Sequence, residues 1–93
     1  MASKFKQALN SGKFVVTTEV GPAKGTNMDA MLHHIDLLKD VVDAINVTDN
    51  QSSVMRFPSV GGCMLVKQKG AEPILQMTCR DRNRMALQAD LLY

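Results

Sequence analysis

The chain has 93 residues, of which 45% are hydrophobic and 22% charged, and it carries a formal net charge of +2. This length allows one small domain at most, and the apolar content is typical of a packed core rather than of a disordered chain. The small charge and the scarcity of Tyr and Trp argue against nucleic-acid binding, and no apolar run approaches the roughly 20 residues that span a bilayer.

The chain begins with a predicted short helix and a strand. Residues 4–12 favour a helix because Phe5 and Leu9 are four apart on one face. Residues 14–20 are rich in β-branched side chains and predict a strand. Two glycines and a proline within residues 21–25 then predict a loop.

The clearest helical pattern follows this loop. Thr26 is a plausible N-cap, and Asp29 would lie in the first turn. The apolar residues fall on one helical stripe, with most of the charged residues off it. This stripe consists of Met28, Met31, Leu32, Ile35, Leu38, Val41 and Val42. The short apolar run 44–47 predicts the second strand.

A second helix is predicted within residues 52–69, with one of the two serines at its start as the cap. Gly70 is well placed as the residue that ends it. Pro58 removes a backbone donor, and Gly61 and Gly62 should each cost about 1 kcal/mol relative to Ala. We therefore expect a helix that is kinked or starts late.

The last elements are a predicted strand at 73–79 and a helix with Asp81 as its candidate N-cap. Helices and strands thus alternate along the chain with short links. Such units predict a parallel sheet with right-handed crossovers. Because no Gly-x-Gly-x-x-Gly motif follows the first strand, a barrel of βα units is favoured over a dinucleotide-binding open sheet.

Polar side chains occur where each predicted strand ends. Glu19 closes the first strand, Thr48-Asp49-Asn50 follow the second, and Gln76 and Thr78 lie in the third. In βα-repeat enzymes, reactive groups gather where strands lead into helices. We therefore predict that these side chains converge at one rim of the sheet.

Each of these residues has a structural alternative. A carboxylate at the end of an apolar strand is costly to bury, so Glu19 is either a proton donor with a raised pKa or a glutamate turned outward to a loop. Thr48, Asp49 and Asn50 also suit ordinary turn chemistry. Gln76 either reaches a ligand or satisfies a neighbouring polar group.

Three arginines, Arg80, Arg82 and Arg84, stand where the last helix should begin. The helix dipole disfavours cations there, which indicates either an anion site or, as we favour, an ion-pair cluster that includes Asp81.

Cys63 and Cys79 form no Cys-x-x-Cys motif. They are interpreted as reduced thiols of a cytoplasmic protein, with a disulfide as the alternative. His33 and His34 would point about 100° apart on a helix and cannot clamp one metal ion.

Several segments together resemble the methylenetetrahydrofolate reductase family over roughly residues 13–92. They are Thr18-Glu19-Val20-Gly21-Pro22, Ile45-Asn46-Val47-Thr48-Asp49-Asn50, Val54-Met55-Arg56, the stretch from Gln76 to Arg84, and Ala86-Leu87-Gln88-Ala89-Asp90-Leu91-Leu92. The resemblance implies a TIM (β/α)8 barrel with FAD against the carboxyl ends of its strands. It also implies reduction of 5,10-methylenetetrahydrofolate to 5-methyltetrahydrofolate, with electrons from NADH, NADPH or another reductant in a ping-pong cycle.

The resemblance also assigns roles to single residues. Glu19 matches the glutamate taken as the general acid that opens the methylene bridge of the folate to an iminium. Thr48 matches a flavin-contacting threonine. Gln76 stands where many members have a histidine beside the flavin, which is a departure from the family pattern.

A complete barrel needs roughly 250 residues, so residues 1–93 are expected to form a single partial domain containing the first three βα units of a truncated barrel. Such a sheet would leave two open edges and would expose Val15, Ile74 or their neighbours. We therefore expect a marginally stable, inactive chain that self-associates or joins a partner chain completing the barrel. A non-catalytic α/β interaction module is the alternative.

Overall fold

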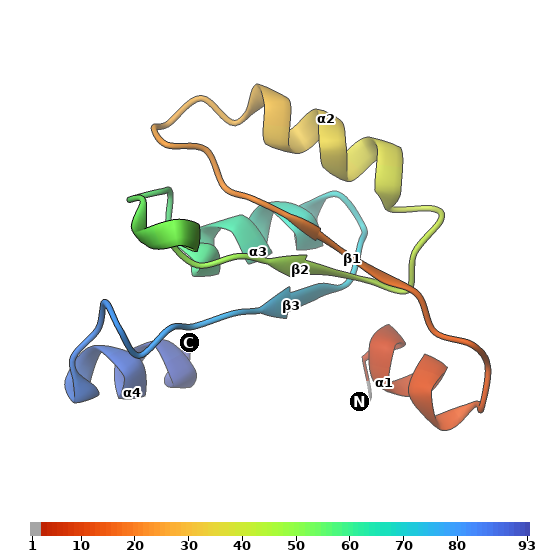
Figure 1. The fold of residues 1–93 in the computed structure, drawn as a ribbon. Coiled ribbons are helices and arrows are strands. Elements are labelled where there is room, and N and C mark those ends of the chain that lie inside the picture. Colours follow the sequence, from red (N-terminus) through yellow and green to blue (C-terminus); the bar gives the residue numbers. More distant parts are fainter. Residues whose placement is uncertain (1–2) are drawn as a thin grey trace.

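A computed structural model describes residues 3–93 as one α/β unit built on a three-stranded parallel sheet in the order β1-β2-β3 (Figure 1). The predicted α/β class and the parallel pairing of the strands are confirmed, whereas the barrel stays a prediction. The strands are β1 (Thr17–Val20), β2 (Ala44–Val47) and β3 (Pro73–Leu75). The helices are α1 (Lys4–Asn10), α2 (Asp29–Leu38), the 3-10 turn η1 (Gln51–Ser53), α3 (Ser59–Gln68) and α4 (Arg84–Leu92).

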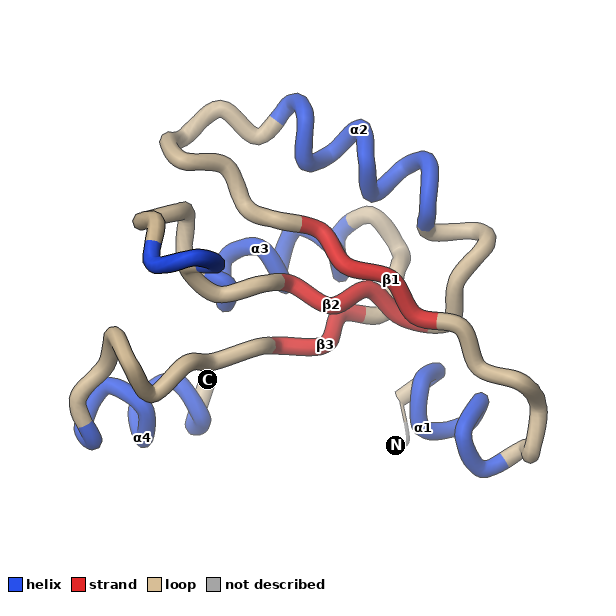
Figure 2. Tube along the Cα trace, viewed as in Figure 1, coloured by secondary structure: helices blue, strands red, loops and turns tan. Residues whose placement is uncertain are grey.

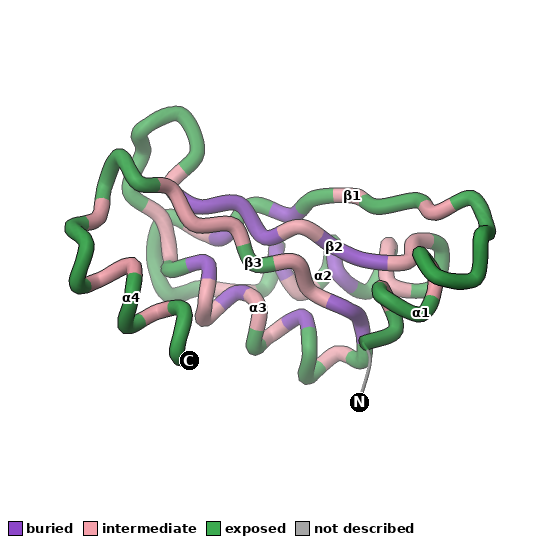
Figure 3. The backbone as a smooth tube through the Cα atoms, turned by 90° about the horizontal axis from the view of Figure 1, so that it is seen from below, coloured by how far each residue is buried: buried purple, intermediate pink, exposed green. Residues whose placement is uncertain are grey.

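The apolar side chains of the sheet lie on the face that α2 and α3 cover. Gly62 of α3 lies close to both Val47 of β2 and Met31 of α2. These elements bury one core, which consists of Val20, Met31, Ile35, Ile45, Val47, Val66 and Ala71. Figure 3 shows the buried residues concentrated along β2, as expected for the central strand. The opposite face of the sheet is left to the alternate side chains.

The strand register determines which of those alternate side chains become neighbours. Glu19 of β1 pairs with Asn46 of β2, and Asn46 pairs with Ile74 of β3. Because side chains of paired residues in parallel strands point to the same face, Glu19 and Asn46 are side by side on the face away from the core. Figure 2 shows the three strands side by side, with a loop leaving the same end of each.

Three predicted N-caps were wrong: those of α2 and α4, and the cap at Ser52 or Ser53, because the N-cap of α3 is Pro58. Thr26 does not cap α2: its N-cap is Met28, and the Asn27 side chain accepts a bond from the Asp29 N–H at 3.0 Å. Asp81 does not cap α4, because it pairs with Arg80; the Asn83 side chain accepts from the Ala86 N–H instead, at 2.8 Å. At α2 and α4 a neighbouring amide side chain supplies the acceptor.

The helix predicted within residues 52–69 starts late, as expected. Residues 51–53 form only the turn η1, and α3 begins after Pro58. Gly70 follows the helix with a φ of +84°, a conformation suited to glycine, which confirms its predicted position.

The outer strands are shorter than predicted, and residues beside them are exposed as expected. The strands expected at 14–20 and 73–79 are ordered as strands only at Thr17–Val20 and Pro73–Leu75. Val15 and Ile74 are half-buried, whereas their neighbours Phe14 and Leu75 are exposed. Helices α1 and α4 contain no buried residue.

No helix within residues 3–93 is long and apolar enough to cross a membrane.

Candidate active site

The polar side chains that follow the three strands line one cavity of about 200 Å³. Glu19 comes from the end of β1, Thr48 from the end of β2, and Gln76 from the end of β3. Asp49, Gln51, Thr78 and Arg80 complete the lining. The structure therefore brings the three residues singled out in the sequence together at the carboxyl ends of the strands, while their chemical roles stay predictions.

Glu19 is exposed at this cavity, and its side chain makes no hydrogen bond or ion pair within residues 3–93. It is turned outward but not bonded to a neighbouring loop, so the structural alternative is correct only in part, and the role as a proton donor stays a prediction. Its carboxyl group is accessible to a ligand that enters the cavity.

Thr48 is buried, with 4% of its surface exposed, and its hydroxyl oxygen has no hydrogen-bond partner in the described part of the chain. A Cβ built on Gly21 would lie 3.7 Å from that oxygen, so the β1–α2 loop passes close to it. A buried hydroxyl without a partner costs about 1–3 kcal/mol. A ligand that bonds to Thr48 would recover that cost.

Gln76 is held at both its backbone and its side chain. The buried Ser59 hydroxyl, in the first turn of α3, donates to the Gln76 carbonyl at 2.8 Å. The Gln76 side-chain amide donates to Asn46 Oδ1 at 3.4 Å. The interpretation that Gln76 satisfies a neighbouring polar group is therefore correct in part, because Gln76 also lines the cavity.

Sequence reasoning missed Asn46 and Ser59. Asn46 lies two residues before Thr48, so in a strand both side chains point to the same face. That alternation, together with an amide inside an apolar strand, was the available signal. No sequence pattern indicates that Ser59 meets Gln76, because the contact depends on how α3 packs against β3.

Asp49 anchors the segment after β3 to the end of β2. Its carboxylate accepts from the Thr78 N–H at 2.7 Å and is paired with both terminal nitrogens of the Arg82 guanidinium, one of them at 2.9 Å. Arg82 also pairs with Asp90 of α4 at 3.2 Å. Asp49 thus links neighbouring strand ends and does not serve ordinary turn chemistry.

The ionisation of Asp49 reflects two opposing effects. Burial raises the pKa of its carboxyl group, but the hydrogen bonds from Arg82 and Thr78 and the positive charge of Arg82 outweigh burial and leave the pKa below its ordinary value. The side chains of the pair are only 1% and 13% exposed. Asp49 is therefore a buried carboxylate held in its charged form.

The predicted ion-pair cluster is confirmed for two of the three arginines. Arg82 pairs with Asp49, and Arg80 pairs with Asp81 at 2.8 Å while also donating to the Asn50 carbonyl at 2.9 Å. Arg84 makes no ion pair within residues 3–93. Arg80, with its charge paired to Asp81, also lines the cavity that Glu19 lines.

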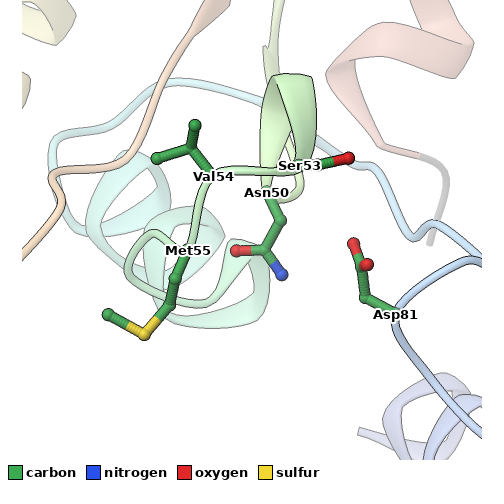
Figure 4. Close-up of a pocket in the computed structure, with 5 residues that line it drawn as sticks. All are labelled: Asn50, Ser53, Val54, Met55 and Asp81. Atoms are coloured by element: carbon green, nitrogen blue, oxygen red, sulfur yellow. The ribbon is translucent and has the colours of Figure 1, made fainter.

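The loop after β2 forms a second hollow, of about 240 Å³, beside this cavity. Figure 4 shows Asn50, Val54 and Met55 on one side of it and Asp81 on the other. Asn50, Ser52 and Ser53 all have a positive φ, between 45° and 60°. Such a conformation costs energy in non-glycine residues and persists where surrounding contacts enforce it.

Arg56 supplies one of the contacts that hold Asn50. Its backbone N–H donates to Asn50 Oδ1 at 2.9 Å, and its guanidinium donates to the Pro22 carbonyl at 3.1 Å. The next residue, Phe57, donates its N–H to the Ala23 carbonyl at 2.7 Å. The loops after β1 and β2 are therefore joined, as those after β2 and β3 are by Asp49.

The cysteines and histidines lie outside the cavity. Burial raises the pKa of the Cys63 thiol to about 11, whereas Cys79 is exposed, and both are free thiols. The rings of His33 and His34 are 6.2 Å apart on the exposed side of α2. Within residues 3–93, no cluster of His, Cys, Asp or Glu side chains is suited to hold a metal ion.

Comparison with known proteins gives one match. No curated protein and no solved structure matches the chain. The family model for methylenetetrahydrofolate reductase matches residues 4–92, which is nearly the whole chain and includes every residue that lines the cavity. The chain therefore belongs to the methylenetetrahydrofolate reductase family, a family of oxidoreductases.

Proposed function

We propose that this chain forms part of a flavin-dependent methylenetetrahydrofolate reductase, and that its sheet contributes three βα units of a (β/α)8 barrel. The observation that carries the proposal is the convergence of Glu19, Thr48 and Gln76 on one cavity at the carboxyl ends of parallel strands. Active sites of βα barrels lie at this end of the strands. The family match supports reduction of 5,10-methylenetetrahydrofolate to 5-methyltetrahydrofolate.

Glu19 would act as the general acid. Its carboxyl group is accessible in the cavity and makes no ion pair within residues 3–93. In its protonated form it can give its proton to the folate nitrogen that leaves the methylene carbon, so that the bridge opens to an electrophilic iminium. Proton donation to a poor leaving group contributes typically 10²–10⁴-fold to the rate.

Thr48 and Gln76 would hold the FAD. The hydroxyl of Thr48 has no partner within residues 3–93 and could therefore bond to a polar ligand. The backbone of Gly21 lies next to this hydroxyl. When bound, FAD would supply the hydride that reduces the folate. The cavity of about 200 Å³ is smaller than the ~300–1,000 Å³ of typical ligand sites, so these residues form one wall of the proposed site.

The first test uses the Glu19→Gln variant in a reductase assembled from this chain and the remaining strands. We expect reduction of the flavin by NADH or NADPH to proceed at its normal rate and folate turnover to fall by about 10²–10⁴-fold, because only the second half-reaction needs the proton. Stopped-flow absorbance measures the two half-reactions separately. The exposed carboxylate of Asp40 provides the control, and Asp40→Asn should change neither rate. Equal loss of both half-reactions in Glu19→Gln contradicts the proposed role.

The second test is titration of the purified 93-residue chain with FAD. One wall of a site supplies too few contacts for tight binding, so we expect no binding at micromolar FAD. Micromolar binding by a monomer would show that the remaining strands are not needed for the flavin.

A partner chain that completes the barrel is the second proposal, and a surface groove favours it. A groove of about 290 Å³ beside α3 and β3 is mostly apolar, and its lining includes Val60, Met64, Leu75 and Tyr93. Within residues 3–93 the sheet pairs as β1-β2-β3, so β1 and β3 each have an edge that no described strand pairs with. Unpaired edges and exposed apolar surface favour either self-association or binding of further strands. A stoichiometric partner that co-purifies and carries the remaining strands would support a split enzyme, and its absence would favour self-association.

A further inference from the structure

We propose that Asn46 is a positioning residue that orients the side-chain amide of Gln76. In this orientation the cavity presents the side-chain oxygen of Gln76, Oε1, to its ligand as a hydrogen-bond acceptor. The ligand group that faces Gln76 would then be a donor, such as the N–H of a heterocyclic ring. This inference rests on the proposed function for the identity of the ligand. The orientation itself follows from two successive contacts across the sheet.

The first contact determines how the Asn46 amide is oriented. Asn46 Nδ2 lies 3.1 Å from the backbone carbonyl oxygen of Thr18 in β1. A carbonyl oxygen can only accept a hydrogen bond, so the NH₂ group of Asn46 must be the one that faces β1. The amide oxygen of Asn46 therefore faces the other way, toward β3.

The second contact carries this orientation from β2 to β3. Asn46 Oδ1 lies 3.4 Å from Gln76 Nε2. Since an amide oxygen can only accept, Gln76 must direct its own NH₂ group toward Asn46. The Ser59 hydroxyl donates to the backbone carbonyl of Gln76 at 2.8 Å, so the main chain from which this side chain extends is also hydrogen-bonded.

The third step is the consequence for the cavity. With its NH₂ group directed at Asn46, Gln76 has its Oε1 at the end of the amide turned away from Asn46. This oxygen accepts no hydrogen bond within residues 3–93, and Gln76 lines the cavity together with Thr48 and Glu19. An acceptor with two free lone pairs selects for a donor on the ligand, because an opposed acceptor would be desolvated without a partner.

The orientation can be tested by NMR on the 93-residue chain without any ligand. We expect a through-hydrogen-bond coupling between Asn46 Nδ2 and the Thr18 carbonyl carbon in the unmodified chain. Asn46→Leu should shift the Gln76 side-chain amide protons toward the values of a solvent-exposed amide, whereas Asn10→Leu, the same change at an exposed position on α1, should leave them unchanged. In the reciprocal variant, Gln76→Leu, the coupling from Asn46 to Thr18 should persist, because the backbone sets the orientation of Asn46.

Two results would overturn the inference. One is the absence of the coupling from Asn46 to Thr18 in the unmodified chain, a measurement that needs no variant to fold. The other is a set of Gln76 amide signals that stays the same in folded Asn46→Leu. Both results concern the orientation alone, so they are independent of whether the assembled protein reduces folate.

A double-mutant cycle in the assembled reductase tests the effect on ligand binding. In FAD titrations, Asn46→Leu should weaken binding by about tenfold, the usual effect of losing one hydrogen bond. In a Gln76→Leu background it should have almost no further effect, because Asn46 acts through Gln76. If Asn46→Leu weakens FAD binding by the same factor in the unmodified protein and in Gln76→Leu, Asn46 stabilises the fold and does not position Gln76. If the NMR results hold but folate is not reduced, the proposed function fails and the orientation stands.

Discussion

At the level of individual residues, the Asp49–Arg82 pair is the most buried ion pair of the described chain. The side chains of Asp49 and Arg82 are 1% and 13% exposed. Removing one partner of such a pair leaves an uncompensated buried charge, which typically costs 3–5 kcal/mol. Arg82 keeps a second partner in Asp90, so the cost here should lie at the low end of that range. The pair joins the end of β2 to the segment that precedes α4 and so keeps Thr48 and Gln76 within one cavity.

The depressed pKa of Asp49 predicts a specific loss of stability in acid. A carboxyl group whose pKa is lower in the folded than in the unfolded chain stabilises the fold above the unfolded pKa of about 3.9, and this contribution is lost as the pH falls through the folded pKa. Asp49→Asn should therefore lower the free energy of unfolding by about 3 kcal/mol at pH 7 and by progressively less below pH ~4. Urea unfolding followed by circular dichroism at several pH values measures this difference.

Asp40→Asn serves as the control for that series, because Asp40 is exposed and should contribute little at any pH. An Asp49→Asn variant that loses the same stability at pH 3 as at pH 7 would contradict a role for the charged carboxylate.

Among the elements, α3 depends on glycine for its contact with the sheet. The sequence predicts Gly61 and Gly62 as unfavourable in a helix, but the structure supplies a reason for Gly62. A Cβ at Gly62 would lie 2.7 Å from Val47 Cγ1 and 3.1 Å from Met31 Cε, and both of these residues belong to the core. The missing side chain allows α3 to approach β2 and α2 closely.

Gly62→Ala should therefore destabilise the chain even though Ala favours helices. The gain in helix propensity is at most about 1 kcal/mol, whereas overpacking a core costs typically 1–3 kcal/mol. We expect a net loss of about 1 kcal/mol in the free energy of unfolding, measured by chemical denaturation. Gly25→Ala is the matched control, because a Cβ there meets no atom within 4 Å. An unchanged or raised stability in Gly62→Ala would show that α3 can shift without cost.

For the molecule as a whole, burial is concentrated in one layer. The core lies between the sheet and two helices, α2 and α3, whereas α1 and α4 contain no buried residue. In Figure 1 both of these outer helices lie apart from the sheet, near opposite ends of the chain. Segments with few buried contacts open at low free energy, so the stability should differ strongly between the centre and the two ends.

Hydrogen exchange measures this difference. We expect the amides of β2 to exchange most slowly and those of α1 and α4 to exchange close to the rate of an unfolded chain. If a partner completes the barrel, its addition should slow exchange along the open edges of β1 and β3. Protection of α4 equal to that of β2 in the isolated chain would contradict the described distribution of stability.

Much of the architecture was predictable because it depends on local patterns. The β-branched run before Glu19, the apolar run 44–47 and the stripe from Met28 determine strands and a helix by periodicity alone. Strand–helix–strand order then determines parallel pairing, which brings Glu19, Thr48 and Gln76 to the same end. Helix starts at Thr26 and Asp81 were mispredicted because several residues nearby could cap the helix, and the choice depends on backbone geometry.

The amino-acid sequence by itself thus determined the α/β class, the parallel pairing and the end of the sheet where polar groups collect, since these follow from periodicity and from the alternation of strands and helices. Only the tertiary structure decided which of those groups touch. The bond from Gln76 to Asn46, the pairing of Arg82 with Asp49 and the close packing at Gly62 join residues 15 to 33 positions apart in the chain. Such contacts depend on strand register and on the distance between layers, and neither is encoded in any local pattern.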